Sequence, residues 1–139
     1  MELYNYRVKA ITKIVDGDTF DCIIDLGFEV LLESRIRMAG IDAPESRTRD
    51  LEEKKFGLYA KEWLTNNLTG DNIIIQTEYH DEKGKFGRIL GTVFVDGINI
   101  NETMIAENVA VKYQGQSKDS IALDHLKNRQ LLLEQGKVN

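Results

Sequence analysis

Residues 6–38 read YRVKAITKIVDGDTFDCIIDLGFEVLLESRIRM, and this stretch decides the fold class of the chain. Apolar and polar side chains alternate from Tyr6 to about Val15, which is the pattern of a half-buried β-strand. Asp16-Gly17-Asp18 is a turn signal, and the β-rich run from Thr19 to Asp25 predicts a second strand after it. Phe28 to Met38 predicts a third strand, so the stretch as a whole predicts an antiparallel meander.

The remainder of the chain predicts one helix, two more strands and then two helices. Apolar residues at helical spacing indicate a helix from Leu51 to Leu68, with Asp50 as its N-cap residue and Gly70 at its C-terminal stop. The other expected elements are strands at 72–79 and 88–95 and helices at 101–107 and 120–135. Asn108 is placed where a left-handed helix cap is needed, and the last helix, with a thin apolar stripe, is expected on the outside.

The order of these elements predicts an α+β fold that is mainly β. We expect a five-stranded Greek-key β-barrel of the OB type with three α-helices, an architecture whose face commonly binds oligonucleotides. At 139 residues, with one proline and no low-complexity run, the chain is expected to form a single domain over residues 1–139.

Bulk charge argues against a nonspecific nucleic-acid binder, because the net charge is −5 and such proteins are usually basic. Any role with nucleic acid must therefore depend on local charge. Cationic residues crowd two segments, Arg35, Arg37, Arg47 and Arg49 in one and Lys83, Lys85 and Arg88 in the other. The alternative is that both segments are solvated surface.

The single cysteine and the first residues of the chain limit further the classes of protein to which it could belong. Cys22 is the single cysteine, so we interpret it as a small buried hydrophobe, and no His/Cys cluster suggests zinc. The first residues lack a signal-peptide pattern, and no apolar run approaches the roughly 18 residues of a membrane span. We expect no membrane partner, a cytoplasmic protein if the chain is full-length, and a secreted one if a leader was removed.

Two short segments carry the candidate chemistry. Asp18 follows a hairpin turn, and Asp42 is expected at the end of the third strand, so neighbouring antiparallel strands bring the two carboxylates together. Oxygen ligands without His or Cys nearby favour Ca²⁺ or Mg²⁺ over a transition metal. Asp-Gly-Asp alone is a common hairpin turn, however, and does not by itself indicate a metal site.

Three further residues complete a candidate catalytic set. Glu45 lies just beyond Asp42 on a loop stiffened by Pro44, where a carboxylate could activate water. Arg37 and Arg88 could each donate bidentately to phosphate and stay charged as negative charge develops. Taken singly, either arginine could equally be a surface salt-bridge partner.

Five motifs in order resemble the staphylococcal nuclease, or thermonuclease, family. They are Val15–Thr19, Arg35–Glu45, Lys85–Arg88, Val95–Glu102 and Ala110–Tyr113. One such motif could arise by chance, whereas the ordered set is highly specific. The fold implied by the resemblance, a five-stranded OB barrel with three helices, agrees with the pattern-based prediction.

The resemblance also implies roles for individual residues. Asp18, Asp42 and the backbone carbonyl of Ala43 would bind Ca²⁺, and Glu45 would act as general base on the attacking water. Arg37 and Arg88 would hold the scissile phosphate, while Lys85 and Tyr113 would contact the neighbouring phosphate and the base. The implied enzyme is a monomeric, calcium-dependent phosphodiesterase that cleaves single-stranded or frayed DNA and RNA with little sequence specificity and leaves 3′-phosphate ends.

The chain departs from the family pattern at three positions. Ala43 stands where the founding member has threonine, Phe86 where tyrosine is common, and Asn108 where glycine is typical. None of the five central residues is affected. The alternative is a noncatalytic OB-fold module that binds nucleic acid or protein, but such modules lose the Asp, Glu and Arg positions that this chain keeps.

Overall fold

The computed structural model describes residues 4–77 and 88–139. Its elements, in chain order, are β1 (Asn5–Asp16), β2 (Thr19–Asp25), β3 (Leu31–Met38), β4 (Ile41–Asp42), α1 (Leu51–Asn67), β5 (Ile73–Gln76), β6 (Ile89–Val95), β7 (Ile98–Asn99), α2 (Ile100–Ala106), β8 (Val111–Lys112) and α3 (Lys118–Glu134). The five longer strands and three helices confirm the predicted α+β fold. The expected strand at 72–79 extends in part into residues outside those described.

The five longer strands close into a barrel. Strands β1, β2 and β3 form the expected antiparallel meander, and β5 pairs antiparallel with both β1 and β6. A parallel pairing of β3 with β6, with Arg37 opposite Leu90, closes the barrel. The closure removes sheet edges that would otherwise be open. It also brings β6, far along the chain, beside the strand that carries Arg37.

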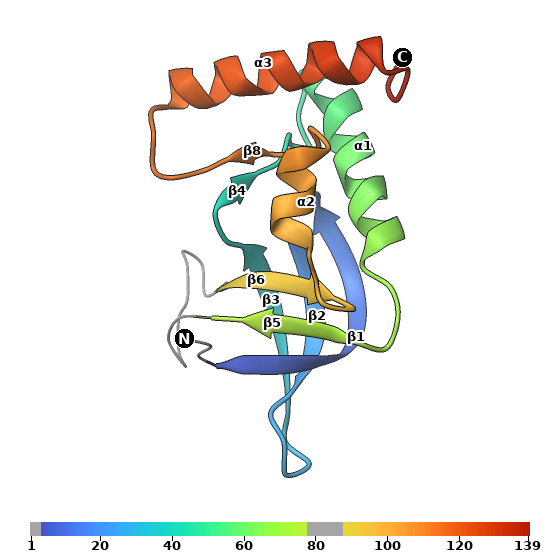
Figure 1. Ribbon diagram of the computed structural model, residues 1–139, viewed down its shortest axis with the longest axis vertical. Helices are drawn as coiled ribbons and strands as arrows, with labels where there is room; N and C mark the ends of the chain where they lie inside the picture. Colours follow the sequence, from blue (N-terminus) through green and yellow to red (C-terminus); the bar gives the residue numbers. More distant parts are fainter. Residues whose placement is uncertain (1–3, 78–87) are drawn as a thin grey trace.

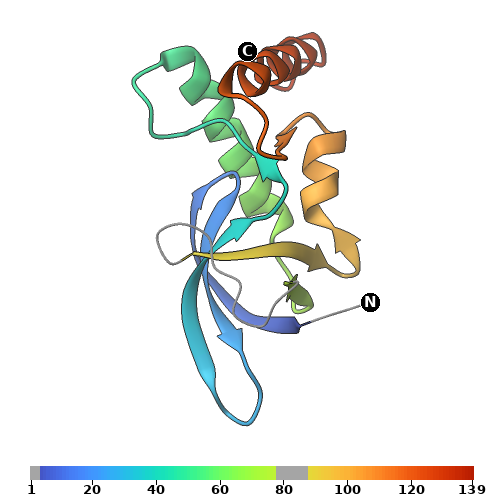
Figure 2. The same ribbon diagram turned by 90° about the vertical axis from the view of Figure 1, so that its left-hand side faces the viewer.

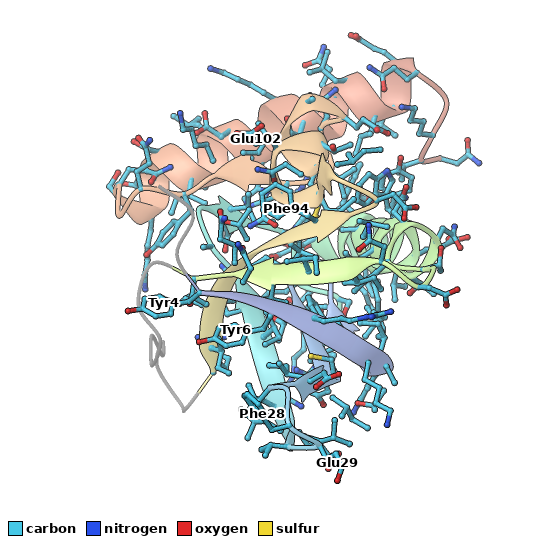
Figure 3. The ribbon with its side chains drawn as sticks, turned by 60° about the horizontal axis from the view of Figure 1, so that its bottom comes forward. Tyr4, Tyr6, Phe28, Glu29, Phe94 and Glu102 are labelled. Carbon is cyan, nitrogen blue, oxygen red and sulfur yellow. The ribbon has the colours of Figure 1, made fainter. Side chains whose placement is uncertain are left out.

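The hairpin between β2 and β3 differs from the prediction. The third strand begins at Leu31, because Phe28 and Glu29 both have positive φ, 56° and 67°, and Val30 N–H donates to the Gly27 carbonyl at 3.0 Å. Two left-handed residues in succession match the twist of a two-residue hairpin turn, which ends the strand pairing there. The tip projects away from the rest of the molecule (Figures 1 and 2) and carries the exposed side chains of Phe28 and Glu29 (Figure 3).

Helix α1 packs one face into the barrel core. Its residues Ala60, Trp63 and Leu64 are buried together with side chains from the barrel strands. Asp50 is the N-cap residue, as predicted, and its Oδ1 accepts the N–H groups of Glu52 and Glu53 at 3.0 and 3.2 Å. Because the helix is fixed at both its cap and its buried face, it is a rigid support for the loop that precedes it.

Helices α2 and α3 follow the last long barrel strand in the chain and complete the fold. Asn108 has φ 63° just after α2, which confirms the predicted left-handed position. Helix α3 begins two residues earlier than predicted, because Ser117 Oγ caps it by accepting Ser120 N–H at 3.2 Å. It lies across one end of the molecule (Figure 1), with Leu132 as its one buried residue, so the outside position is confirmed.

Two further observations concern the single cysteine and membrane-spanning helices. Cys22 is fully buried among core side chains, and burial raises the pKa of its thiol to about 12. Within residues 4–77 and 88–139, no helix combines the length and the apolar character that a membrane crossing requires.

Candidate active site

The Asp-Gly-Asp turn between β1 and β2 holds the loop that follows β4. Asp18 Oδ2 accepts the Ala43 N–H at 2.9 Å, and its Oδ1 accepts the Thr19 hydroxyl at 2.9 Å. Asp16 Oδ1 accepts both the N–H and the hydroxyl of Ser46, the N–H at 3.1 Å. The two aspartates therefore fix both ends of the segment 43–46, which contains Glu45.

The centre of that turn has no space for a side chain, so it requires glycine at position 17. A Cβ atom at Gly17 would lie 2.6 Å from the Cβ of Ala60 and 3.0 Å from the Cβ of Ala43. The turn therefore contacts α1 on one side and the loop on the other. Sequence reasoning interpreted the turn as a source of one metal ligand and missed Asp16, Gly17 and Ser46 as parts of the scaffold.

Asp42 is placed differently from the prediction. It does not end the third strand, which stops at Met38; it lies in β4, paired with Val111 of β8. The reason is local, because Gly40 has φ 76° and turns the chain out of β3. In Figure 1, β4 and β8 run side by side beneath α3. Asp42 still lies close to Asp18, as predicted, because the chain turns at Gly40 between β3 and β4.

Arg37 joins the two aspartates. Its Nη2 lies 3.5 Å from Asp18 Oδ2 and 3.5 Å from Asp42 Oδ1. The guanidinium also donates to the carbonyls of Met38 and Ile41 at 2.8 and 2.9 Å, which holds it in the β3–β4 corner. One cationic group thus lies between both candidate metal ligands.

Burial strongly affects Asp18. Desolvation raises the pKa of its carboxyl, and the nearby Asp42 carboxyl raises it slightly further. The Arg37 charge, the Ala43 N–H and the Thr19 hydroxyl act in the opposite direction without cancelling the effect of burial. A buried carboxylate in this setting gains by having a cation next to it.

The side chains around Asp18 and Asp42 offer oxygen donors to a metal ion. No cluster of three or more His, Cys, Asp or Glu side chains that could hold a metal occurs among the described residues. Asp18 and Asp42, with the backbone of Ala43 hydrogen-bonded to Asp18, supply oxygen donors alone. Such a set fits a hard cation that keeps several water or substrate ligands, and it does not fit zinc.

Glu45 lies at the edge of this group with an exposed side chain. Its backbone is held from two directions: its N–H donates to Glu53 Oε2 at 3.4 Å, and a Cβ at Gly57 would overlap its carbonyl group. Helix α1 therefore passes in direct contact with the Glu45 backbone. The carboxylate remains accessible to water while its main chain is fixed.

The remaining predicted residues divide into two groups. Arg88, just before β6, and Tyr113, just after β8, both line the same cleft as Arg37, Asp42 and Glu45. Tyr113 N–H donates to the Gly40 carbonyl at 2.8 Å, which attaches it to the β3–β4 corner. Lys85 and Phe86 lie outside the described residues. Arg35 points elsewhere, because it pairs with Asp21 at 2.7 Å on the exposed face of the meander.

The cleft has a volume of about 940 Å³, and α3 forms one of its walls. His125 of α3 contributes to the site directly, since its Nε2 lies 2.8 Å from Asp42 Oδ2. Because an ionised carboxylate only accepts hydrogen bonds, Nε2 is the donor. His125 was missed from sequence, where a lone histidine 83 residues from Asp42 gives no local signal.

Comparisons with known proteins identify the family of the chain. Residues 35–135 match the family described as staphylococcal nuclease homologue. Relatives include an uncharacterized Bacillus anthracis protein, 31% identical over 74% of this chain and 49% of its own length, and the endonuclease YhcR of Bacillus subtilis, 32% identical over 74% of this chain and 9% of its own.

The thermonuclease of Staphylococcus hyicus is 26% identical, over 76% of this chain and 59% of its own length. The chain therefore spans about half or less of the first two relatives. With the family match covering most of its residues, the chain belongs to the staphylococcal nuclease family.

Proposed function

We propose that this chain is a calcium-dependent phosphodiesterase that hydrolyses DNA and RNA with low sequence specificity and leaves 3′-phosphate ends. The observation that carries the proposal is the contact of Arg37 Nη2 with both Asp18 and Asp42, 3.5 Å to each, in a cleft also lined by Glu45 and Arg88. Family membership and the endonuclease and thermonuclease names of several relatives support it.

Asp18, Asp42 and the carbonyl of Ala43 would hold the calcium ion. When bound, Ca²⁺ supplies positive charge next to the scissile phosphate and orients it. The hydrogen bond from His125 to Asp42 Oδ2 orients one of these carboxylates, and the Ala43 and Thr19 donors orient the other. The residues that would bind the cation are thus themselves fixed by neighbours from separate parts of the fold.

Glu45 is the proposed general base. Its carboxylate accepts a proton from the attacking water, whose oxygen bonds to phosphorus as the bond to the 5′ oxygen breaks. The 5′ oxygen takes up a proton from solvent water and leaves as a hydroxyl, and the phosphate stays on the 3′ side. A main chain fixed against α1 with an exposed carboxylate suits this role, because the base must be both positioned and open to water.

Arg37 and Arg88 stabilise the charge that develops on the phosphate oxygens. Both guanidinium groups line the cleft, and a planar guanidinium can donate two parallel hydrogen bonds to a phosphate. Tyr113, at the cleft wall with a half-exposed ring, is suited to contact a nucleobase. Lys85 is proposed, from the resemblance alone, to contact the neighbouring phosphate.

The test is digestion of single-stranded DNA and of RNA by the purified chain with Ca²⁺, with Mg²⁺ and with a calcium chelator. We expect cleavage of both polymers with Ca²⁺, none with chelator, and products that carry a 3′-phosphate by mass spectrometry. Equal activity with and without chelator, or none under any condition, would contradict the proposal.

Glu45→Gln is the decisive variant, and Glu62→Gln, an exposed carboxylate on α1 away from the cleft, is its control. The first is expected to lose activity by at least about 10²-fold and the second to keep it. Tight oligonucleotide binding by the wild-type chain without turnover at millimolar Ca²⁺ would favour the noncatalytic alternative.

A further inference from the structure

Helix α3 turns a cationic face toward the cleft. Lys118, Ala122, His125 and Arg129 all line it, and their spacing of four, three and four residues places them on one side of the helix. The acidic residues that line the same cleft are Asp42, Glu45, Asp50 and Glu53. The wall formed by α3 thus adds positive charge to a cleft within a chain whose net charge is −5.

Arg129 is the unusual member of this face. Its guanidinium carbon lies 5.5 Å from the centroid of the Phe56 ring, and Phe56 is buried beneath it. Nε of Arg129 is buried without a hydrogen-bond partner, and across residues 4–77 and 88–139 no carboxylate forms an ion pair with the group. Arg35 and Arg37, by contrast, both pair with aspartates.

Two acidic side chains of the cleft, those of Asp50 and Glu53, form hydrogen bonds elsewhere. Asp50 caps α1 through its Oδ1, and Glu53 Oε2 accepts the Glu45 N–H. Neither is directed to Arg129. A planar cation that is stacked on a buried ring is held in one orientation and keeps its outer nitrogens available for an anion.

We propose that Arg129 binds a substrate phosphate next to the scissile one and forms a second phosphate subsite. The inference rests on the proposed function, since it extends the same cleft. At about 940 Å³, the cleft is at the upper end of the range for small-ligand sites, which leaves room for more than one nucleotide. A guanidinium donates bidentately to phosphate, so its contact depends on the sugar–phosphate backbone and not on base identity.

The subsite predicts dependence on substrate length. A dinucleotide has the scissile phosphate alone, whereas a trinucleotide or longer substrate has a neighbouring phosphate as well. For the wild-type chain, we expect kcat/KM to rise by about 10-fold when the neighbouring phosphate is added, the size of effect typical for a charge-assisted hydrogen bond.

Arg129→Gln should remove a large part of this rise, with any remainder due to Lys85, and leave the dinucleotide rate within about twofold. Arg129→Lys, which keeps the charge but loses the planar fork, should retain part of it. Lys127→Gln is the matched control, because it removes the same charge from an exposed position of the same helix that does not line the cleft. It should behave as wild type at both substrate lengths.

A purely structural role for Arg129 makes a different prediction. If its contact with Phe56 only attaches α3 to α1, Arg129→Gln will lower the melting temperature and depress dinucleotide and trinucleotide cleavage equally. That result would overturn the proposal, as would equal length dependence in Arg129→Gln and Lys127→Gln.

Failure of the proposed function can be told apart from failure of the subsite. A wild-type chain that cleaves nothing contradicts the former, and the subsite is then tested by binding of a fluorescent oligothymidylate. In that assay Arg129→Gln, and not Lys127→Gln, should reduce the slope of log affinity against log salt by about 0.7, the value for one phosphate contact on a single strand. Equal slopes in the two variants would overturn the subsite.

Discussion

Gly57 of α1 lies directly against the backbone carbonyl of Glu45, so closely that a Cβ atom at position 57 would overlap it. Glycine in a helix interior usually costs about 1 kcal/mol relative to alanine. Here the missing side chain allows the helix to approach the loop that carries the proposed base. The contact makes α1 part of the active-site scaffold without contributing a catalytic group.

Gly57→Ala is therefore expected to displace Glu45. A shift of about 1 Å in a catalytic group can cost on the order of 10²-fold in rate, and we expect a loss of that size in kcat. Leu58→Ala, at the exposed neighbouring position, is the control and should retain activity. A folded Gly57→Ala protein with wild-type kcat would show that the loop adjusts freely.

His125 is expected to act on Asp42 and not on the substrate. Removing its hydrogen bond in His125→Ala should raise the Ca²⁺ concentration for half-maximal activity by about 10- to 100-fold, the usual effect of losing a group that orients a metal ligand. At saturating Ca²⁺, kcat should largely recover. His125→Gln, which keeps a donor, should be milder; a lowered kcat with unchanged Ca²⁺ dependence would contradict this role.

Asp18→Asn is expected to separate stability from activity. Burial raises the pKa of this carboxyl, so the ionised form is costly in the metal-free fold, and asparagine removes that charge. We expect the free energy of unfolding, measured in chelator by urea titration, to rise, because the buried charge is removed while Arg37 keeps Asp42 as its partner. Nuclease activity should be lost in the same variant. A destabilised Asp18→Asn protein would indicate that Arg37 compensates fully.

Arg88→Lys should lower kcat by on the order of 10²-fold, because the ammonium keeps the charge but cannot donate two parallel hydrogen bonds to the phosphate. Arg35→Lys is a suitable control, since Arg35 lies on the exposed face of the meander and pairs with Asp21. Steady-state kinetics on one oligonucleotide would compare them. Equal kcat values in both variants would remove Arg88 from the proposed mechanism.

Cys22 gives a prediction on pH. Its thiol has an ordinary pKa near 9.0 in the unfolded chain, and burial raises it to about 12 in the fold. Between these values the unfolded state loses a proton that the folded state keeps, so stability falls as pH rises from about 9 to 12. At pH 8 a thiol reagent should modify the native protein at least about 100-fold more slowly than the urea-unfolded protein. Rapid labelling of native protein would contradict its burial.

The parts of the fold that follow local rules could be predicted from the sequence. The alternation of apolar and polar side chains predicted the meander, and Asp50 predicted the start of α1. Both signals are local, because strand period and helix capping depend on neighbours in the chain. The start of β3 was predicted too early, since Phe28 and Glu29 adopt a left-handed turn that their residue types do not favour.

The candidate site was only partly predictable for the same reason. The residue types at positions 18 and 42 suggested a shared cation, but the corner at Gly40 that brings Asp42 to Asp18 depends on the pairing of β4 with β8. Ser46 meets Asp16 from 30 residues away, and His125 meets Asp42 from 83. Contacts at such separations leave no periodic trace in the sequence.

The docking of α3 has a consequence for when the site exists. The helix is attached through a small apolar cluster of Leu132, Val138 and Phe56, separate from the barrel core, and it brings His125 and Arg129 to the cleft. During synthesis, every barrel strand leaves the ribosome before this helix does. A nascent chain can therefore close its barrel next to messenger RNA while the wall of the cleft is still absent. Translation order itself delays completion of the site until α3 and Val138 have left the ribosome.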